Sequence, residues 1–72
     1  MSDKQKIIEV IQDIQLPDKG NALDFGCGNG VLTEIIRQVL PSWNIYGVDL
    51  SKTAVDNAKK RYQNCNFFEP NE

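Results

Sequence analysis

A glycine-rich run and two aspartates are the residues of this sequence whose types and spacing could do chemistry. The run is Gly26-Cys27-Gly28-Asn29-Gly30; Asp24 precedes it and Asp49 follows it later in the chain. Glycines let the backbone turn sharply and approach a ligand closely, and exposed amides at a helix start can donate hydrogen bonds to ligand oxygens. Asp49 can accept hydrogen bonds from two ribose hydroxyls. The set indicates a ligand that contains a nucleoside.

The spacing of the glycines argues against a dinucleotide. The dinucleotide fingerprint is G-x-G-x-x-G. Its third glycine would fall at Val31 if the motif began at Gly26, and at Thr33 if it began at Gly28. A carboxylate as close as Asp24 would also repel a pyrophosphate, whereas it suits a ligand that carries an ammonium group. A fragment that binds nicotinamide adenine dinucleotide (NAD) stays as an alternative.

The elements that must position these residues alternate along the chain. The first helix is expected from a capping box of Ser2 and Gln5 up to Leu16, before Pro17. After it we expect strand 22–25, helix 31–40, strand 43–48, a helix from the N-cap Ser51 to about residue 62, and a short strand at 67–68. This order predicts an α/β fold with a parallel sheet. The glycine run and Asp49 then follow neighbouring strands at their carboxyl ends, where such sheets bind ligands.

Apolar positions indicate which side chains the helices bury. In the first helix the isoleucines share one face, and in the second helix a wide apolar face is expected. The residues of that apolar face are Val31, Leu32, Ile35, Ile36, Val39 and Leu40. The positions expected to be buried in the third helix are Ala54, Val55, Ala58 and Tyr62. The aromatic residues expected mainly in the core are Trp43, Tyr46, Phe67 and Phe68.

Two segments resemble motifs of one enzyme family. Residues 22–30 (ALDFGCGNG) look like the first motif of class I S-adenosylmethionine-dependent methyltransferases, and residues 46–51 (YGVDLS) look like the second. The resemblance runs from about Ala22 to Tyr62, with the isoleucine-rich helix in the place of the family's leading helix. It implies a Rossmann-like three-layer sandwich, here truncated to a partial parallel sheet of about three strands with three helices.

The resemblance also implies S-adenosylmethionine as the cofactor, with a role for each matching position. Asp24 would help to hold the methionine amino group through water, and the glycines would shape the loop under the methionine and ribose. Asp49 would bind the ribose hydroxyls, and Leu50 would pack against the adenine. The cofactor-binding positions are Asp24, Gly26, Cys27, Gly28, Gly30, Asp49 and Leu50.

Several of these positions have a structural alternative. Asp24 could be a strand-end carboxylate that caps the loop amides, and Asp49 could be a helix N-cap, although Ser51 is better placed. The glycines could form a plain tight turn. Cys27 is expected to be a small filler of the loop rather than a catalytic thiol, because no partner base is in sight.

The resemblance covers only the first half of such a domain. Residues 1–20 are expected to form a leading helix and turn, and residues 21–72 the first half of the cofactor-binding domain. The family's acidic residue after the third strand could be Glu69 or Glu72. The segment that usually carries substrate and catalytic residues is absent, so the catalytic residues and the methyl acceptor stay unknown. We expect the chain alone to bind cofactor at best.

The free edge of the first strand has a consequence for partners. With all helices on one face, an open edge and a bare apolar face favour self-association or a missing C-terminal half as a partner. A non-catalytic module for ligand sensing or assembly is the other alternative.

The composition of the chain narrows the remaining classes of function and location. The 72 residues carry 8 basic and 10 acidic side chains, a net charge of -2, which gives no strong nucleic-acid signal. There is no histidine, and the two cysteines are far apart, so no metal site is expected. Reduced cysteines and the lack of a targeting signal favour the cytoplasm. No apolar stretch is long enough for a membrane span.

Overall fold

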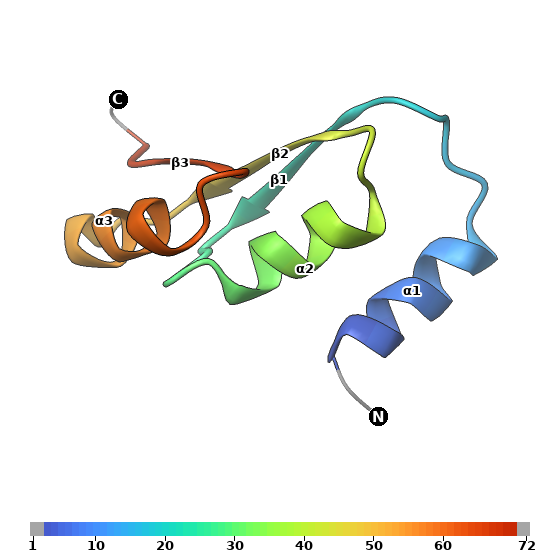
Figure 1. Ribbon diagram of the computed structural model, residues 1–72, viewed down its shortest axis with the longest axis horizontal. Helices are drawn as coiled ribbons and strands as arrows, with labels where there is room; N and C mark the ends of the chain where they lie inside the picture. Colours follow the sequence, from blue (N-terminus) through green and yellow to red (C-terminus); the bar gives the residue numbers. More distant parts are fainter. Residues whose placement is uncertain (1–2, 71–72) are drawn as a thin grey trace.

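The computed structural model describes residues 3–70, which form an alternating α/β fold (Figure 1). Its elements are α1 (Asp3–Asp13), β1 (Asn21–Phe25), α2 (Val31–Val39), β2 (Asn44–Val48), α3 (Lys52–Arg61) and β3 (Asn66–Phe68). The predicted order of elements and the α/β class are confirmed. Ser2 of the predicted capping box lies outside the described residues.

The described strands form one parallel sheet in the order β1-β2-β3. Leu23 of β1 lies opposite Tyr46 of β2, and Gly47 of β2 lies opposite Phe67 of β3. β2 is therefore the central strand and β1 lies at an edge. Because all three strands run the same way, the loop after β1 and the turn after β2 meet at one end of the sheet.

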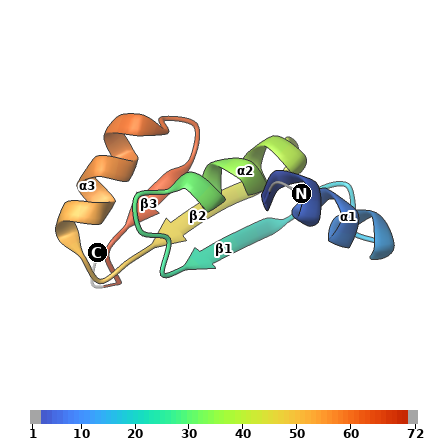
Figure 2. The same cartoon turned by 90° about the horizontal axis from the view of Figure 1, so that it is seen from below.

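The helices lie on one side of this sheet (Figure 1, Figure 2). α2 and α3 pack against β2 and β3, whereas α1 packs beside α2. The described residues thus form two of the three layers of the sandwich that the resemblance implies. Within residues 3–70, no helix reaches the length and apolarity that crossing a bilayer requires.

The first helix is shorter than its sequence pattern predicts. It ends at Asp13 rather than Leu16, and Ile14 makes one last turn by donating its amide to the Ile11 carbonyl at 3.3 Å. An acidic residue at a helix C-terminus opposes the helix dipole, and α1 has no basic residue in its last turn. Ile14 and Leu16 are exposed, so no packing compensates for this.

The third helix begins where predicted. The Ser51 side chain accepts a hydrogen bond from the Ala54 amide at 3.2 Å, which satisfies one of the unpaired donors of the first turn. Its last turn carries Lys59, Lys60 and Arg61, which the helix dipole favours. Val55 and Ala58 are fully buried, as expected from their spacing.

The core lies between the sheet and α3 and is centred on Phe67. The residues of this core are Cys27, Val55, Ala58, Cys65 and Phe67. Ile45 and Val48 of β2 are buried as well. A Cβ atom added at Gly47 would come within 2.6 Å of the Phe67 ring, and one added at Gly30 within 2.7 Å. These two glycines therefore make the space that the Phe67 ring fills. Trp43, Tyr46 and Phe68 are only partly buried.

The buried face of α2 differs from the one that its apolar residues predict. Val31 and Leu32 are each 44% exposed, whereas Thr33 between Leu32 and Glu34 is fully buried. Ile35, Ile36 and the following apolar residues are half-buried. Val31 and Leu32, at the start of the expected apolar face, are thus largely exposed, because the first turn of α2 directs Thr33 towards β1.

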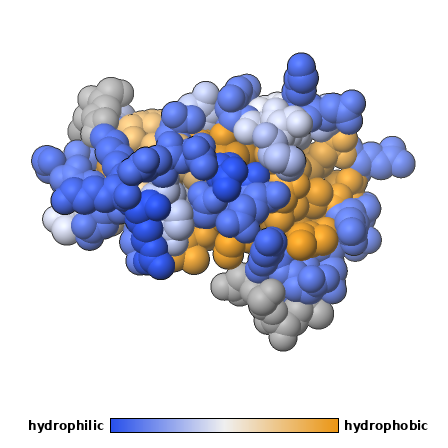
Figure 3. All heavy atoms as spheres, in the orientation of Figure 1, coloured by the Kyte–Doolittle hydropathy of each residue, from blue (hydrophilic) through white to orange (hydrophobic). Residues whose placement is uncertain are grey.

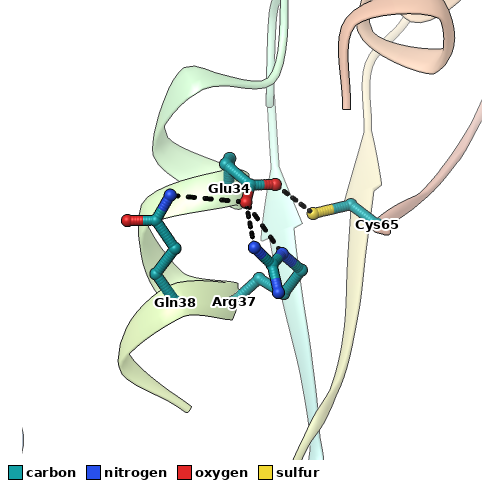
Figure 4. A network of polar contacts seen from close by, with 4 residues as sticks. All are labelled: Glu34, Arg37, Gln38 and Cys65. Carbon is teal, nitrogen blue, oxygen red and sulfur yellow. Dashed lines mark hydrogen bonds and ion pairs between the residues drawn. The ribbon is translucent and has the colours of Figure 1, made fainter. Parts of the chain in front are cut away.

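A polar network ties α2 to the segment before β3 (Figure 4). Glu34 accepts hydrogen bonds from the Arg37 guanidinium, with Nε at 2.8 Å, and from the Gln38 amide at 3.4 Å. Its other oxygen accepts the Cys65 thiol at 3.5 Å. The Arg37 hydrogen bond is the main reason why the pKa of Glu34 lies below its usual value. Burial, followed by the Glu34 charge, raises the pKa of Cys65 to about 11.

The opposite face of the sheet carries apolar side chains with no helix over them. Leu23 is 57% exposed and Phe25 is 76% exposed. By the strand register, Tyr46 and Phe68 lie on the same face, where their rings meet edge to face with centroids 6.4 Å apart. The expected bare apolar face is therefore present in the described part of the chain.

Candidate cofactor site

Asp49 stands where the glycine loop and the end of β2 meet. One carboxylate oxygen accepts the Ser51 amide at 2.8 Å, and the other accepts the Gly28 amide at 2.9 Å. These backbone hydrogen bonds, from Ser51 first and Gly28 second, lower the pKa of Asp49. Each oxygen of an ionised carboxylate has a further lone pair, so the group can still accept hydrogen bonds from a ligand. Ser51, and not Asp49, is the N-cap of α3.

The amides of the glycine loop bind the protein itself. The Gly26 and Cys27 amides both donate to the Val48 carbonyl, at 2.7 and 2.9 Å, and the Gly30 amide donates to the Cys27 carbonyl at 3.0 Å. These three loop amides are therefore already paired, and the expectation for the amides at the helix start concerns the residues that follow them. The contacts of the paired amides join the end of β1 to the end of β2 and give the loop a fixed shape.

The three loop glycines all have left-handed backbone angles, but they face different surroundings. Their φ values are 79° at Gly26, 57° at Gly28 and 90° at Gly30. No atom lies within 4 Å of a Cβ placed at Gly26 or Gly28, whereas Gly30 faces Phe67 and Ala58. Gly26 and Gly28 thus leave open space beside the loop, as a close ligand would need. Gly30 serves the packing of the core.

Asp24 points towards α2 rather than towards the loop amides. Its Oδ2 atom accepts a hydrogen bond from the Thr33 hydroxyl at 2.7 Å. The contacts do not support the alternative that Asp24 caps the loop. The loop amide that donates to a carboxylate is that of Gly28, and the carboxylate that accepts it is that of Asp49. Asp24 is half-buried at the carboxyl end of β1.

Cys27 lies inside the loop as the small filler that its sequence context suggests. It is 8% exposed, and its thiol donates to the Gly28 carbonyl at 3.6 Å. Burial raises the pKa of the Cys27 thiol, and the charges of Asp24 and then Asp49 raise it further. The thiolate, which is the nucleophilic form, is therefore disfavoured.

A pocket of about 160 Å³ opens at this end of the sheet. Its lining residues are Phe25, Gly26, Val48, Asp49, Leu50 and Pro70. Small-molecule sites usually measure about 300–1,000 Å³, so these residues form part of a site rather than a whole one. Leu50 is 83% exposed and offers an apolar surface beside the Asp49 carboxylate. Apolar walls, a carboxylate and open space at the glycines fit a nucleoside.

A larger pocket, of about 340 Å³, lies at the other end of the sheet. It is formed by α1, the end of α2 and Trp43, and Figure 3 shows apolar side chains gathered over this region. Trp43 donates its indole N–H to the Pro17 carbonyl at 3.2 Å there. Since open parallel sheets bind ligands at the carboxyl ends of their strands, the smaller pocket is the better candidate site.

Sequence reasoning missed three residues around the site. Thr33 holds Asp24, Gly47 admits Phe67, and Pro70 lines the pocket. Thr33 had a signal, because it shares a helical stripe with Ile36, and so did Gly47, since glycine inside a strand marks a close approach. Pro70 had none. Glu69 directly follows β3 and is half-buried, and Glu72 lies outside the described residues.

The sequence matches the family model of the methyltransferase domain over residues 22–71. This range covers both the glycine loop and Asp49. It begins at the second residue of β1 and extends past the end of β3.

Two curated proteins illustrate the relatives. The chain is 41% identical over 59 residues to uncharacterized phycocyanin operon protein W of Pseudanabaena tenuis, which covers 79% of this chain and 56% of that protein. It is 35% identical over 57 residues to the release factor glutamine methyltransferase of Aliivibrio fischeri, which covers 79% of this chain and 20% of that protein. The chain thus spans about half the length of the first and a fifth of the second.

A solved structure of a methyltransferase matches the fold. The plantazolicin methyltransferase BpumL, in complex with a monoazolic desmethylPZN analog and S-adenosylhomocysteine (SAH), superposes with a TM-score of 0.69. It is 29% identical, and the match covers 90% of this chain and 25% of BpumL. These findings do not favour the NAD-binding alternative.

Proposed function

This chain belongs to the methyltransferase domain family, whose cofactor is S-adenosylmethionine, and we propose that it forms the cofactor-binding part of such an enzyme. The observation that carries the proposal is the meeting of Gly28 and Asp49 at 2.9 Å beside an apolar pocket. Open space at two loop glycines and a hydrogen-bonding carboxylate at one sheet edge suit a nucleoside with a short polar tail.

The chain's own residues would hold the cofactor as follows. Asp49 accepts the ribose hydroxyls, and Leu50 packs on the adenine. Gly26 and Gly28 leave room for the ribose and the methionine part. Asp24 binds the amino group, either directly or through water. When bound, the cofactor supplies a methyl group activated by its sulfonium, so the protein's contribution is mainly positioning.

Calorimetric titration tests this proposal. We expect the 72-residue chain to bind SAH and to leave NAD unbound, because the third glycine of the dinucleotide fingerprint is absent. Binding of NAD but not SAH would contradict the proposal. Since the chain covers only part of its relatives, we expect binding without turnover, and the methyl acceptor is unidentified.

A polypeptide partner is a second part of the proposal. The exposed Leu23 and Phe25 and the unpaired edge of β1 favour burial against another chain, either a second copy or a C-terminal half of the domain. Sedimentation at micromolar concentration should show self-association, or a shift on adding that half. A stable monomer with sharp, cooperative melting would contradict this.

The two sequence regions and the location complete the proposal. Residues 1–20 would lead into a cofactor-binding unit that starts at residue 21. We propose a cytoplasmic location, which free thiols at Cys27 and Cys65 support, because reduced cysteines are typical of that compartment.

A further inference from the structure

Thr33 is a polar residue on the face of α2 that packs towards the sheet. It is the third residue of α2 and is completely buried, and no other polar or charged residue among residues 3–70 is buried. A hydroxyl in such a place costs stability unless it forms a hydrogen bond. Its hydroxyl donates to Asp24 Oδ2 at 2.7 Å, the distance of a strong O–H···O bond.

This hydrogen bond fixes the direction of the Asp24 carboxylate. A hydroxyl has one hydrogen to donate and an ionised carboxylate can only accept, so the pair has one arrangement. With Oδ2 held by α2, the Oδ1 atom stays available for a ligand. Asp24 and Asp49 both act on the Cys27 thiol through their charge, so both carboxylates lie close to the glycine loop.

We propose that Thr33 is a positioning residue, which orients Asp24 to receive the amino group of the cofactor. The inference rests on the proposed function, since it assigns a task to a contact within that site. Thr33 touches no cofactor itself: it acts through one carboxylate oxygen. Its effect is therefore confined to ligands that carry the amino group.

Two ligands and two substitutions test this role in the full chain. Thr33→Val removes the hydroxyl and keeps the branched shape, whereas Thr33→Ser keeps the hydroxyl. SAH carries the amino group, and 5′-methylthioadenosine has the same nucleoside and thioether without it. We expect Thr33→Val to weaken SAH binding about tenfold and methylthioadenosine binding less than about twofold. Thr33→Ser should stay within about threefold of the unmodified chain for both ligands.

A double-mutant cycle separates positioning from packing. If Thr33 acts through Asp24, then Thr33→Val has no further effect on SAH affinity in a chain that already carries Asp24→Asn. If the Thr33→Val chain does not fold, the pair Thr33→Ser and Thr33→Ala gives the same comparison, because both lack the methyl group and differ only in the hydroxyl. The Ala variant should then bind SAH about tenfold more weakly than the Ser variant.

The outcomes distinguish this inference from the proposed function. The role of Thr33 alone would be overturned by equal SAH affinity with and without the hydroxyl. It would also be overturned by an equal loss of affinity for SAH and for methylthioadenosine. An unmodified chain that binds neither ligand would overturn the proposed function, and this inference with it.

Discussion

The amide of Gly28 donates a hydrogen bond to Oδ2 of Asp49 at 2.9 Å, although the two residues are 21 positions apart in sequence. The bond joins the loop after β1 to the turn after β2. Two parts of the candidate site are therefore assembled by the fold before a ligand arrives. Such preorganisation reduces the ordering cost of binding.

Replacing Asp49 tests the central residue of the site. Asp49→Ala removes the expected ribose acceptor and leaves the Gly28 and Ser51 amides without their partner. We expect SAH affinity to fall at least about 100-fold, because hydrogen bonds to a charged group are among the stronger ones. Titration calorimetry measures the change, and unchanged affinity would refute the role.

A matched variant controls for charge and folding. Asp18→Ala makes the same substitution at an exposed residue in the turn before β1, at the far end of the sheet from the candidate pocket. It should bind SAH as the unmodified chain does. A melting scan of both variants shows whether either has lost its fold.

Two glycine substitutions distinguish backbone strain from packing. Gly26→Ala and Gly30→Ala both place a side chain at a positive φ, which costs about 1–2 kcal/mol. Only the second also places its Cβ 2.7 Å from the Phe67 ring, and such overpacking costs a further ~1–3 kcal/mol. Urea unfolding should rank Gly30→Ala as clearly less stable. Equal losses would show that Phe67 moves aside easily.

The elements of the fold could be predicted because each has a local signal. Pro17 and Pro41 mark where helices have ended, Ser51 begins a helix, and Gly26 follows a short apolar strand. Asp49 could be placed at the ligand edge because parallel strands bring their carboxyl ends together. The helix α1 ends early because its last turn has an acidic and no basic residue, and because Ile14 and Leu16 beyond it are exposed.

The contacts within the site could not be predicted in the same way. The Gly26 and Cys27 amides share the Val48 carbonyl, which depends on how closely two strand ends approach. The rotation of α2 about its axis turns Thr33 towards Asp24, whereas an apolar pattern alone places Leu32 inward. Both depend on how elements that are far apart in sequence pack together.

Acid should weaken the link between α2 and the segment before β3. The Arg37 hydrogen bond holds the pKa of Glu34 below its ordinary value of 4.5, so the folded state favours the ionised form. The resulting stability is complete above about pH 4.5 and is lost as the pH falls through the lowered pKa. When the pH is lowered from 7 to 3, the free energy of unfolding measured with urea should fall by about 1 kcal/mol less in the Glu34→Gln chain than in the unmodified chain. Parallel losses would contradict this.

Cys65 should react slowly in the folded chain. Burial and the Glu34 charge raise its pKa from 9.0 to about 11, so at pH 8 it carries about 100-fold less thiolate than an ordinary cysteine. In a Cys27→Ala chain, which keeps one thiol, a disulfide reagent at pH 8 should react at least about 100-fold more slowly without urea than with it. Because the folded state prefers the neutral thiol, its contribution to stability is present below pH 9 and is lost as the pH rises towards 11. Equal reaction rates in the folded and unfolded chain would show that Cys65 is accessible and ionises normally.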